Sequence, residues 1–299
     1  MKLKSSKPHY EKLKNKWVAK HKAIQNNLWE KHEESLNWLS KNISPQKLAI
    51  GSLGSLLLLT GSPQHAIAPA NLAVSRDDIL NGFDKNVLLA EQLSEILPKE
   101  VQPLDSNEEN SAVDLLSKNF GFKVTAELDS IKLNRNYGLI GGEQHLYRYP
   151  GDNAYAHADN ASDWAMFGPS GIAPGLGAWG YFAPSKEQFG EIDKERERYY
   201  LAIQTFLAPG FAENVGKYRD FFKFRKMLVV NPKTGQAVVA VIGDAGPAEW
   251  TGKHLGGSPE VMHFVGLAEG PRKGAVLYFF IDDPKNQVPL GPIKVQTKA

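Results

Sequence analysis

The stretch that decides the fold runs from residue 226 to residue 247 and reads KMLVVNPKTGQAVVAVIGDAGP. Two apolar runs flank the turn residues 231–235, NPKTG, and this arrangement predicts a β-hairpin. The second run ends at Asp244, which is followed by Gly246 and Pro247. A carboxyl group at the end of a strand has two interpretations. It either takes part in catalysis or ligand binding, or it is a turn residue that accepts hydrogen bonds from backbone N–H groups.

From about residue 123 onward, the sequence around this hairpin also predicts mostly short strands and turns. Residues 274–281, GAVLYFFI, predict a final apolar strand, and residues 257–267, GSPEVMHFVGL, predict a short helix. Residues 168–180, GPSGIAPGLGAWG, predict a turn-rich loop. Residues 185–207 are the exception, because we expect an inserted helix there, with its charged run 191–198 facing solvent.

The order of these elements resembles the double-psi β-barrels of cell-wall proteins, namely the rare lipoprotein A-like and expansin-like families. The matching features are the strand with Asp-x-Gly-Pro at 238–247, the Asn-x-x-x-Gly hairpin before it, and the short helix and closing strand after it. The resemblance covers 225–283 well and 137–182 loosely. It implies that residues 126–299 form a mostly β domain, a six-stranded double-psi β-barrel with an inserted helix.

The same resemblance implies a saccharide groove and, in the lytic members, a catalytic Asp at this motif. Asp244 would act as the acid/base of a lytic transglycosylase, which protonates the glycosidic oxygen and then activates the sugar's own hydroxyl. Ala245 stands where the family usually has Arg, and Gly243 where it usually has Asn. An expansin-like module that binds carbohydrate without cleaving it, or a structural surface module, is therefore the alternative.

Residues 142–152, GEQHLYRYPGD, predict a further strand. Alternation places four of its side chains on one face, namely Glu143, His145, Tyr147 and Tyr149. If that face lines the groove, Glu143 and His145 are catalytic partners of Asp244, and Tyr147 contacts the substrate. If it does not, the four side chains form an exposed sheet face.

His157 and Asp159 are a second candidate pair, since a His and an Asp two residues apart share a strand face and are suited to acid/base work. No third ligand follows at a recognisable spacing, so we expect no metal and no cofactor. Trp179, Tyr181 and Trp250 are candidates for stacking on sugar rings, although aromatic side chains are equally common in cores.

Composition narrows the possible chemistry. The chain has 299 residues, of which 42% are hydrophobic, so it can bury a sizeable core. It contains no cysteine, which excludes thiol catalysis, disulfides and cysteine-bound metals. Residues 1–47 hold eleven lysines and four glutamates, a net charge of +7, so the rest of the chain carries −5. A mildly acidic body is a poor partner for phosphates, and we expect no nucleic-acid binding.

The N-terminal part predicts an association with a membrane. The apolar run 48–61 follows the basic head and has the length of a signal-peptide core, so 48–70 is a signal peptide or an uncleaved anchor. A buried core helix is the alternative. Residues 1–47 predict a basic helix that either lies on a membrane or packs on a partner. The positive-inside rule places this helix in the cytoplasm.

The remaining organisation follows from this placement. Residues 71–125 predict a helical spacer, with helices near 77–97 and 111–119. The body of the chain is then secreted or membrane-anchored outside the cytoplasmic membrane. There its expected partner is peptidoglycan or another cell-wall polysaccharide.

Overall fold

The computed structural model describes residues 85–296 of the chain. The predictions made for residues 1–47 and 48–70 lie outside the described residues. Between residues 85 and 296, no helix is long and apolar enough to cross a membrane.

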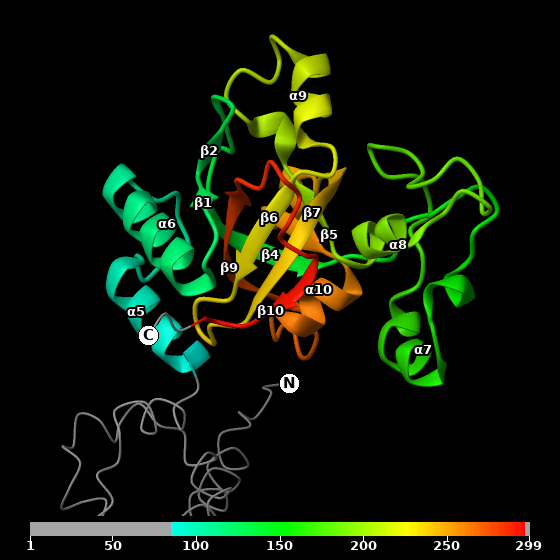
Figure 1. The fold of residues 1–299 in the computed structure, drawn as a ribbon, viewed down its shortest axis with the longest axis horizontal. Helices are drawn as coiled ribbons and strands as arrows, with labels where there is room; N and C mark the ends of the chain where they lie inside the picture. Colours follow the sequence, from blue (N-terminus) through cyan, green and yellow to red (C-terminus); the bar gives the residue numbers. More distant parts are fainter. Residues whose placement is uncertain (1–84, 297–299) are drawn as a thin grey trace, which may run out of the picture. The chain divides into compact units, whose positions relative to one another are not determined.

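Six strands form a closed barrel at the centre of the described chain (Figure 1). Their order around the barrel is β9-β4-β8-β5-β7-β6, and the pairing of β6 with β9 closes it. The pairs β4/β8 and β5/β7 are parallel, and the other four are antiparallel. This mixed barrel is compatible with a double-psi fold. Its strands are β4 (Tyr137–Gly142), β5 (Tyr200–Ile203), β6 (Lys226–Val230), β7 (Ala237–Ala245), β8 (Leu255–Gly257) and β9 (Lys273–Ile281).

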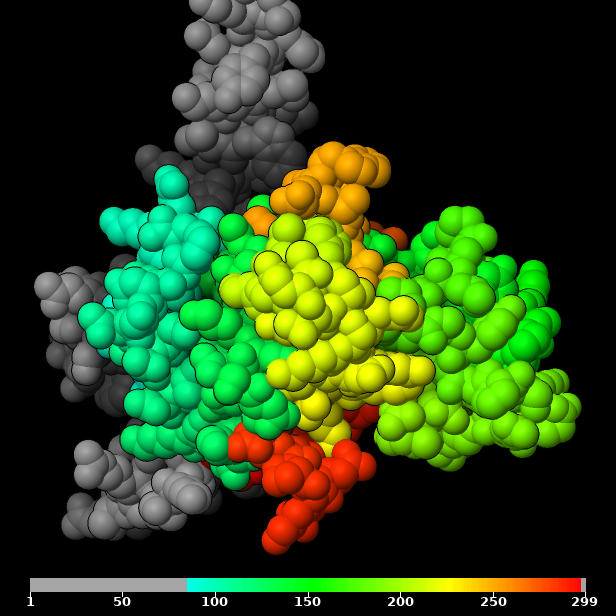
Figure 2. All heavy atoms as spheres, turned by 90° about the horizontal axis from the view of Figure 1, so that it is seen from above, coloured from blue at the N-terminus to red at the C-terminus, as the bar shows by residue number. Residues whose placement is uncertain are grey.

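Helices and short strands surround the barrel. Helices α5 and α6 lie on one side of it, and α7 and α8 lie on the opposite side (Figures 1 and 2). Strand β1 pairs with β9, β10 pairs with β7, and β2 and β3 pair with each other. The bounds are α5 (Lys85–Ile96), α6 (Ser106–Phe120), β1 (Val124–Thr125), β2 (Glu127–Leu128), β3 (Ile131–Lys132), α7 (Ala161–Phe167), α8 (Glu191–Arg198), α9 (Val215–Phe222), α10 (Pro259–Phe264) and β10 (Gly291–Ile293). Short 3₁₀ turns are η2 (Ala154–His157), η3 (Gly168–Ser170), η4 (Thr205–Leu207) and η5 (Glu249–Thr251).

The predicted hairpin is confirmed as β6 and β7. Its apolar run is continuous because both faces of β7 are buried: Val238 and Ile242 pack with residues of β5, β8 and β9, whereas Val239 packs with α5 and α6. The turn uses Asn231, whose Oδ1 accepts the N–H of Lys233 at 3.0 Å. The apolar strand predicted at 274–281 and the short helix are likewise confirmed, as β9 and α10, although β10 rather than β9 is the last strand of the described chain.

Two sequence predictions are wrong in their extent. The inserted helix ends at Arg198, and residues 200–203, YLAI, form the central strand β5, which is fully buried between β7 and β8. A buried apolar run of four residues is short for a helix and suits a strand. The predicted strand over 142–152 is also absent, because β4 ends at Gly142 and only an isolated bridge joins His145 to Ile172.

The helices predicted within 71–125 are present as α5 and α6, and they pack on the barrel. Leu93, Leu116 and Phe120 are fully buried in one cluster with strand residues such as Leu228 and Phe279. Helix α6 is well delimited, since Asp105 caps its first turn and Gly121 ends it with φ of 76°. The two helices thus share a core with the barrel.

Candidate functional site

Asp244 lies near the end of β7, as the hairpin prediction requires. Its Oδ1 accepts two backbone N–H groups, from Ala178 at 2.5 Å and from Ala245 at 2.8 Å. Burial raises the pKa of the carboxyl group above its ordinary value, and the two N–H bonds offset part of this effect. Asp244 is therefore both a capped turn residue and a desolvated acid.

The glycine-rich loop covers this carboxyl group. A Cβ atom on Gly177 would lie 3.2 Å from Cγ of Asp244 and 3.3 Å from Cδ1 of Leu146, so only glycine allows this approach without a shift. The indole N–H of Trp179 donates to the carbonyl oxygen of Ile242 at 3.1 Å. The loop is thus bonded to the end of β7 at Ile242 and at Asp244 itself.

A crevice with a volume of about 510 Å³ opens at the same end of the barrel. Phe224 lines it and donates its N–H to the carbonyl oxygen of Ile242, two residues before Asp244. Lys223 and Asp220 also line it, so its wall carries both signs of charge. Asp244 and the glycine-rich loop are not among the residues that line this crevice.

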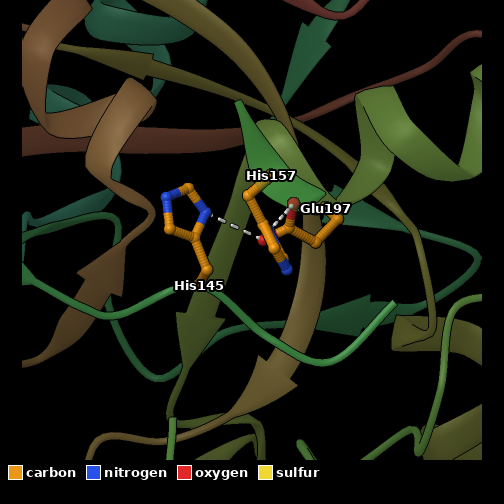
Figure 3. A group of neighbouring side chains, drawn as sticks. All are labelled: His145, His157 and Glu197. Carbon is orange, nitrogen blue, oxygen red and sulfur yellow. Dashed lines mark hydrogen bonds and ion pairs between the residues drawn. The ribbon is translucent and has the colours of Figure 1, made fainter. Parts of the chain in front are cut away.

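A second cluster of polar side chains is buried between the segment after β4 and α8. Figure 3 shows the rings of His145 and His157 facing the carboxylate of Glu197. Nδ1 of His145 lies 3.2 Å from Oε1, and Nδ1 of His157 lies 3.1 Å from Oε2. Arg148 Nε also donates to Oε2 at 2.9 Å. Glu197 is completely buried, yet these donors satisfy it.

The electrostatics of this cluster follow from its contacts. Burial alone would raise the pKa of Glu197, but the bonds from the two histidines and the charge of Arg148 hold it well below its ordinary value. Burial would lower the pKa of His157, but bonds to Asp152, at 2.8 Å, and Glu197 raise it instead. In this hydrogen-bonded form, protonated His157 and Arg148 balance the charges of Asp152 and Glu197.

Glu260, at the start of α10, adjoins this cluster. It is 3% exposed, and neither carboxyl oxygen has a hydrogen-bond partner among residues 85–296. Burial raises its pKa to about 7, while His145 acts to lower it and Glu197 to raise it further. Nε2 of His145 is also buried without a partner within the described chain. Both the carboxyl group of Glu260 and Nε2 of His145 are therefore buried without a hydrogen-bond partner in the described chain.

Of the predicted catalytic residues, the structure brings His145 and His157 together, with ring centroids 4.6 Å apart. Glu143 instead pairs with Lys253 at 2.6 Å. Asp159 pairs with Lys194 and Arg198 at the surface, at 2.6 and 3.0 Å.

Tyr200 links the two regions electrostatically. It is fully buried, and burial raises its pKa well above the ordinary value, with Glu143, Glu197 and Asp244 adding to the effect. Its hydroxyl donates to the carbonyl oxygen of Gln144. Asp244 and Glu197 thus both act on the pKa of Tyr200, although no hydrogen bond joins Asp244 to the buried cluster within residues 85–296.

The predicted substrate-binding aromatics are placed differently from one another. Trp250 is 88% exposed in η5, just after Asp244, and Tyr181 is 37% exposed at the end of the glycine-rich loop. Trp179 is partly buried against the barrel core, and Tyr147 is half-buried. Trp250 and Tyr181 are thus accessible to a ligand, whereas Trp179 mainly fixes the loop.

Sequence reasoning missed Glu197 and Glu260. Glu197 lies in a charged run that we expected to face solvent, and the signal that distinguishes it is its position, three residues before the buried strand β5. Together with His145 and His157 it forms a group whose ligand atoms all lie within 4.8 Å of one another, a geometry that could hold a metal ion.

Comparison with known proteins adds no assignment, because no family model, no curated protein and no solved structure matches the chain.

Proposed function

We propose that the chain is a cell-envelope protein that binds and cleaves peptidoglycan-type glycan, with Asp244 as the acid/base of a lytic transglycosylase. The barrel is compatible with the rare lipoprotein A-like and expansin-like families that its sequence resembles. The observation that carries the proposal is the desolvated carboxyl group of Asp244 at the end of β7, whose pKa is raised by burial. A raised pKa favours the protonated acid that such a reaction needs.

The chemistry proceeds in two proton transfers. Protonated Asp244 gives its proton to the glycosidic oxygen as the bond from that oxygen to the anomeric carbon breaks. The resulting carboxylate then takes the proton of a hydroxyl on the same sugar, and that oxygen bonds to the anomeric carbon. The products are a shortened glycan and an anhydro sugar, with no water consumed. The N–H groups of Ala178 and Ala245 hold Oδ1 during both steps, which leaves Oδ2 to exchange the proton.

The variant Asp244→Asn tests this role, because the Asn side-chain oxygen still accepts both N–H bonds while the group no longer titrates. Full-length protein is incubated with peptidoglycan, and released anhydro-muropeptides are measured by mass spectrometry. We expect release by the wild type and by Asp114→Asn, an exposed control on α6. Asp244→Asn should lose release and keep binding. Undiminished release by Asp244→Asn would rule out the catalytic role.

Trp250 supports the alternative function, a module that binds carbohydrate without cleaving it. An indole ring that is 88% exposed is available to stack on a sugar face. Binding to peptidoglycan that is lost in Trp250→Ala, without any release of muropeptides by the wild type, would favour this function. Absence of both binding and release would leave only a structural surface role.

The location outside the cytoplasmic membrane is part of the proposal and has its own test. Protease added to intact cells should cut within 71–299 and spare 1–47. Cleavage confined to 1–47 would contradict it.

A further inference from the structure

We propose that His145, His157 and Glu197 bind a divalent transition-metal ion such as Zn²⁺. All three side chains are at least 97% buried, and their ligand atoms lie within 4.8 Å of one another. The two ring nitrogens lie 3.2 and 3.1 Å from the oxygens of Glu197. Bonds of about 2.0–2.1 Å at the tetrahedral angle separate neighbouring ligands by about 3.3 Å, and the contacts of both rings with Glu197 are close to this separation.

The distances also bear on the alternative, a purely hydrogen-bonded cluster. Hydrogen bonds between charged partners are typically about 2.7–2.9 Å long. The contact of His157 with Asp152 meets this value at 2.8 Å, whereas both histidine contacts with Glu197 are longer. Both spacings fall within the range of N–H···O hydrogen bonds and also approach the separation of two ligands around a shared ion.

The surroundings have the outer contacts that metal ligands usually require. A ligating histidine generally donates its other N–H to a carboxylate, and His157 Nε2 faces Asp152 in this way. Ligating carboxylates are themselves hydrogen-bonded, and Glu197 accepts the Nε–H of Arg148 and the N–H of Leu146. These contacts fix the ring of His157 and the carboxylate of Glu197 in the ligating orientation.

Glu260 is the independent observation that points to a cation. Its two oxygens and Nε2 of His145 are buried without partners among the described residues. With an ion on Nδ1, the ring of His145 keeps its proton on Nε2. Glu260 adds a further buried carboxyl group to this region of the protein. The ion and Arg148 then balance the three carboxylates of Glu197, Asp152 and Glu260. The ion therefore offsets the negative charge of this buried region, whereas the oxygens of Glu260 still have no hydrogen-bond partner among residues 85–296.

The ligand types indicate the class of metal and its role. Two imidazoles and one carboxylate favour Zn²⁺ or a neighbouring transition metal over Mg²⁺ or Ca²⁺. Trp164 and Phe167 of α7 lie over the two histidines and leave no room for a substrate. The ion would therefore be structural and would tie the segment after β4 to α8. The glycine-rich loop that covers Asp244 lies between these two attachment points.

The test measures Zn²⁺ binding by the full-length protein after removal of metals with EDTA. The ligand variants are His145→Asn and His157→Asn, since the Asn amide can replace the Nδ1–H bond to Glu197 but is a poor ligand. The control is His263→Asn, an exposed histidine on α10. The readouts are bound Zn²⁺ per chain by mass spectrometry, the shift of the unfolding temperature with Zn²⁺, and the visible absorption of the Co²⁺ form. None of them requires activity on glycan.

We expect the wild type and His263→Asn to bind one more Zn²⁺ per chain than either ligand variant, and to unfold at a higher temperature with Zn²⁺. The wild type and all the variants keep the histidines at 9, 21, 32 and 65, so any Zn²⁺ bound by those residues cancels in this comparison. Asp152→Asn should weaken binding by about 10–100-fold. If a ligand variant fails to fold, the tetrahedral Co²⁺ spectrum of the wild type decides. Equal Zn²⁺ binding by wild type and both ligand variants, or no Co²⁺ spectrum, would overturn the proposal and leave a hydrogen-bonded cluster.

Discussion

Burial raises the pKa of Asp244, at the end of β7, and of Glu260, on α10, and the surroundings of the two carboxyl groups separate their roles. Asp244 keeps one oxygen bonded to two backbone N–H groups near the protein surface. Glu260 is buried beside the histidine cluster with no bonds to either oxygen in the described chain. The arrangement of Asp244 suits a group that exchanges protons with a ligand. The arrangement of Glu260 suits a carboxylate whose charge is balanced by a nearby cation.

Glu260 should make the metal-free protein less stable as the pH rises. Its pKa is about 7 in the folded state, against about 4.3 in an unfolded chain, so the folded state binds the proton more tightly. Stability is then lost as the pH rises from about 4.3 through 7, by up to about 4 kcal/mol. In urea titrations with EDTA present, Glu260→Gln should be more stable than the wild type at pH 8. The exposed control Glu269→Gln should follow the wild type. Identical pH dependence in all three proteins would contradict this.

Asp244 should set the alkaline limit of glycan cleavage. The acid must be protonated to donate, so the rate falls as the pH rises through its pKa, which burial raises above the value of about 3.9 of an ordinary Asp. The measurement is kcat/KM for a soluble glycan fragment across the pH range. A profile whose only loss lies on the acidic side would show that Asp244 does not act first as an acid.

At the scale of elements, the sequence predicted the strands and helices whose positions depend on neighbouring residues alone. The hairpin β6–β7, strand β9 and helix α10 follow from turn residues and apolar runs and are confirmed. Strand β5 was missed because only its position between β7 and β8 makes YLAI a strand. His145 and His157 were predicted as site residues, but their grouping with Glu197 was missed for the same reason, since Glu197 reaches His145 across 52 residues. The order of the strands in the barrel determines which buried side chains contact one another. That order is not evident from the sequence.

The glycine-rich loop offers a matched pair of variants. Gly177→Ala places a Cβ atom 3.2 Å from Cγ of Asp244 and forces the loop or the carboxyl group to shift, whereas Gly175→Ala meets no heavy atom within 4 Å. We expect Gly177→Ala to reduce kcat/KM about tenfold or more, because small displacements of a reacting group are costly. Gly175→Ala should differ little from the wild type. Equal activities would show that the loop does not position Asp244.

At the scale of the whole described chain, the N-terminal helices and the barrel share one apolar cluster. Leu116 on α6 is fully buried in it beside residues of β6 and β9. The expected helical spacer is thus a structural part of the barrel's outer face.

Leu116→Ala should therefore destabilise the barrel itself. Removing a buried leucine side chain costs about 2–5 kcal/mol, and the loss should appear in one cooperative transition followed by near-UV circular dichroism. Val87→Ala, a control on the exposed side of α5, should change stability by no more than about 0.5 kcal/mol. An unchanged barrel transition in Leu116→Ala would mean that the helices unfold independently.

The central claim is that Asp244 is the working carboxyl group of a glycan-cleaving barrel. The most direct measurement is the rate of anhydro-muropeptide release from peptidoglycan by full-length wild type and Asp244→Asn at equal concentration. We predict a loss of about 10²–10⁴-fold in the variant, the usual contribution of a general acid/base, with binding to peptidoglycan retained. Equal rates in the two proteins would contradict the claim.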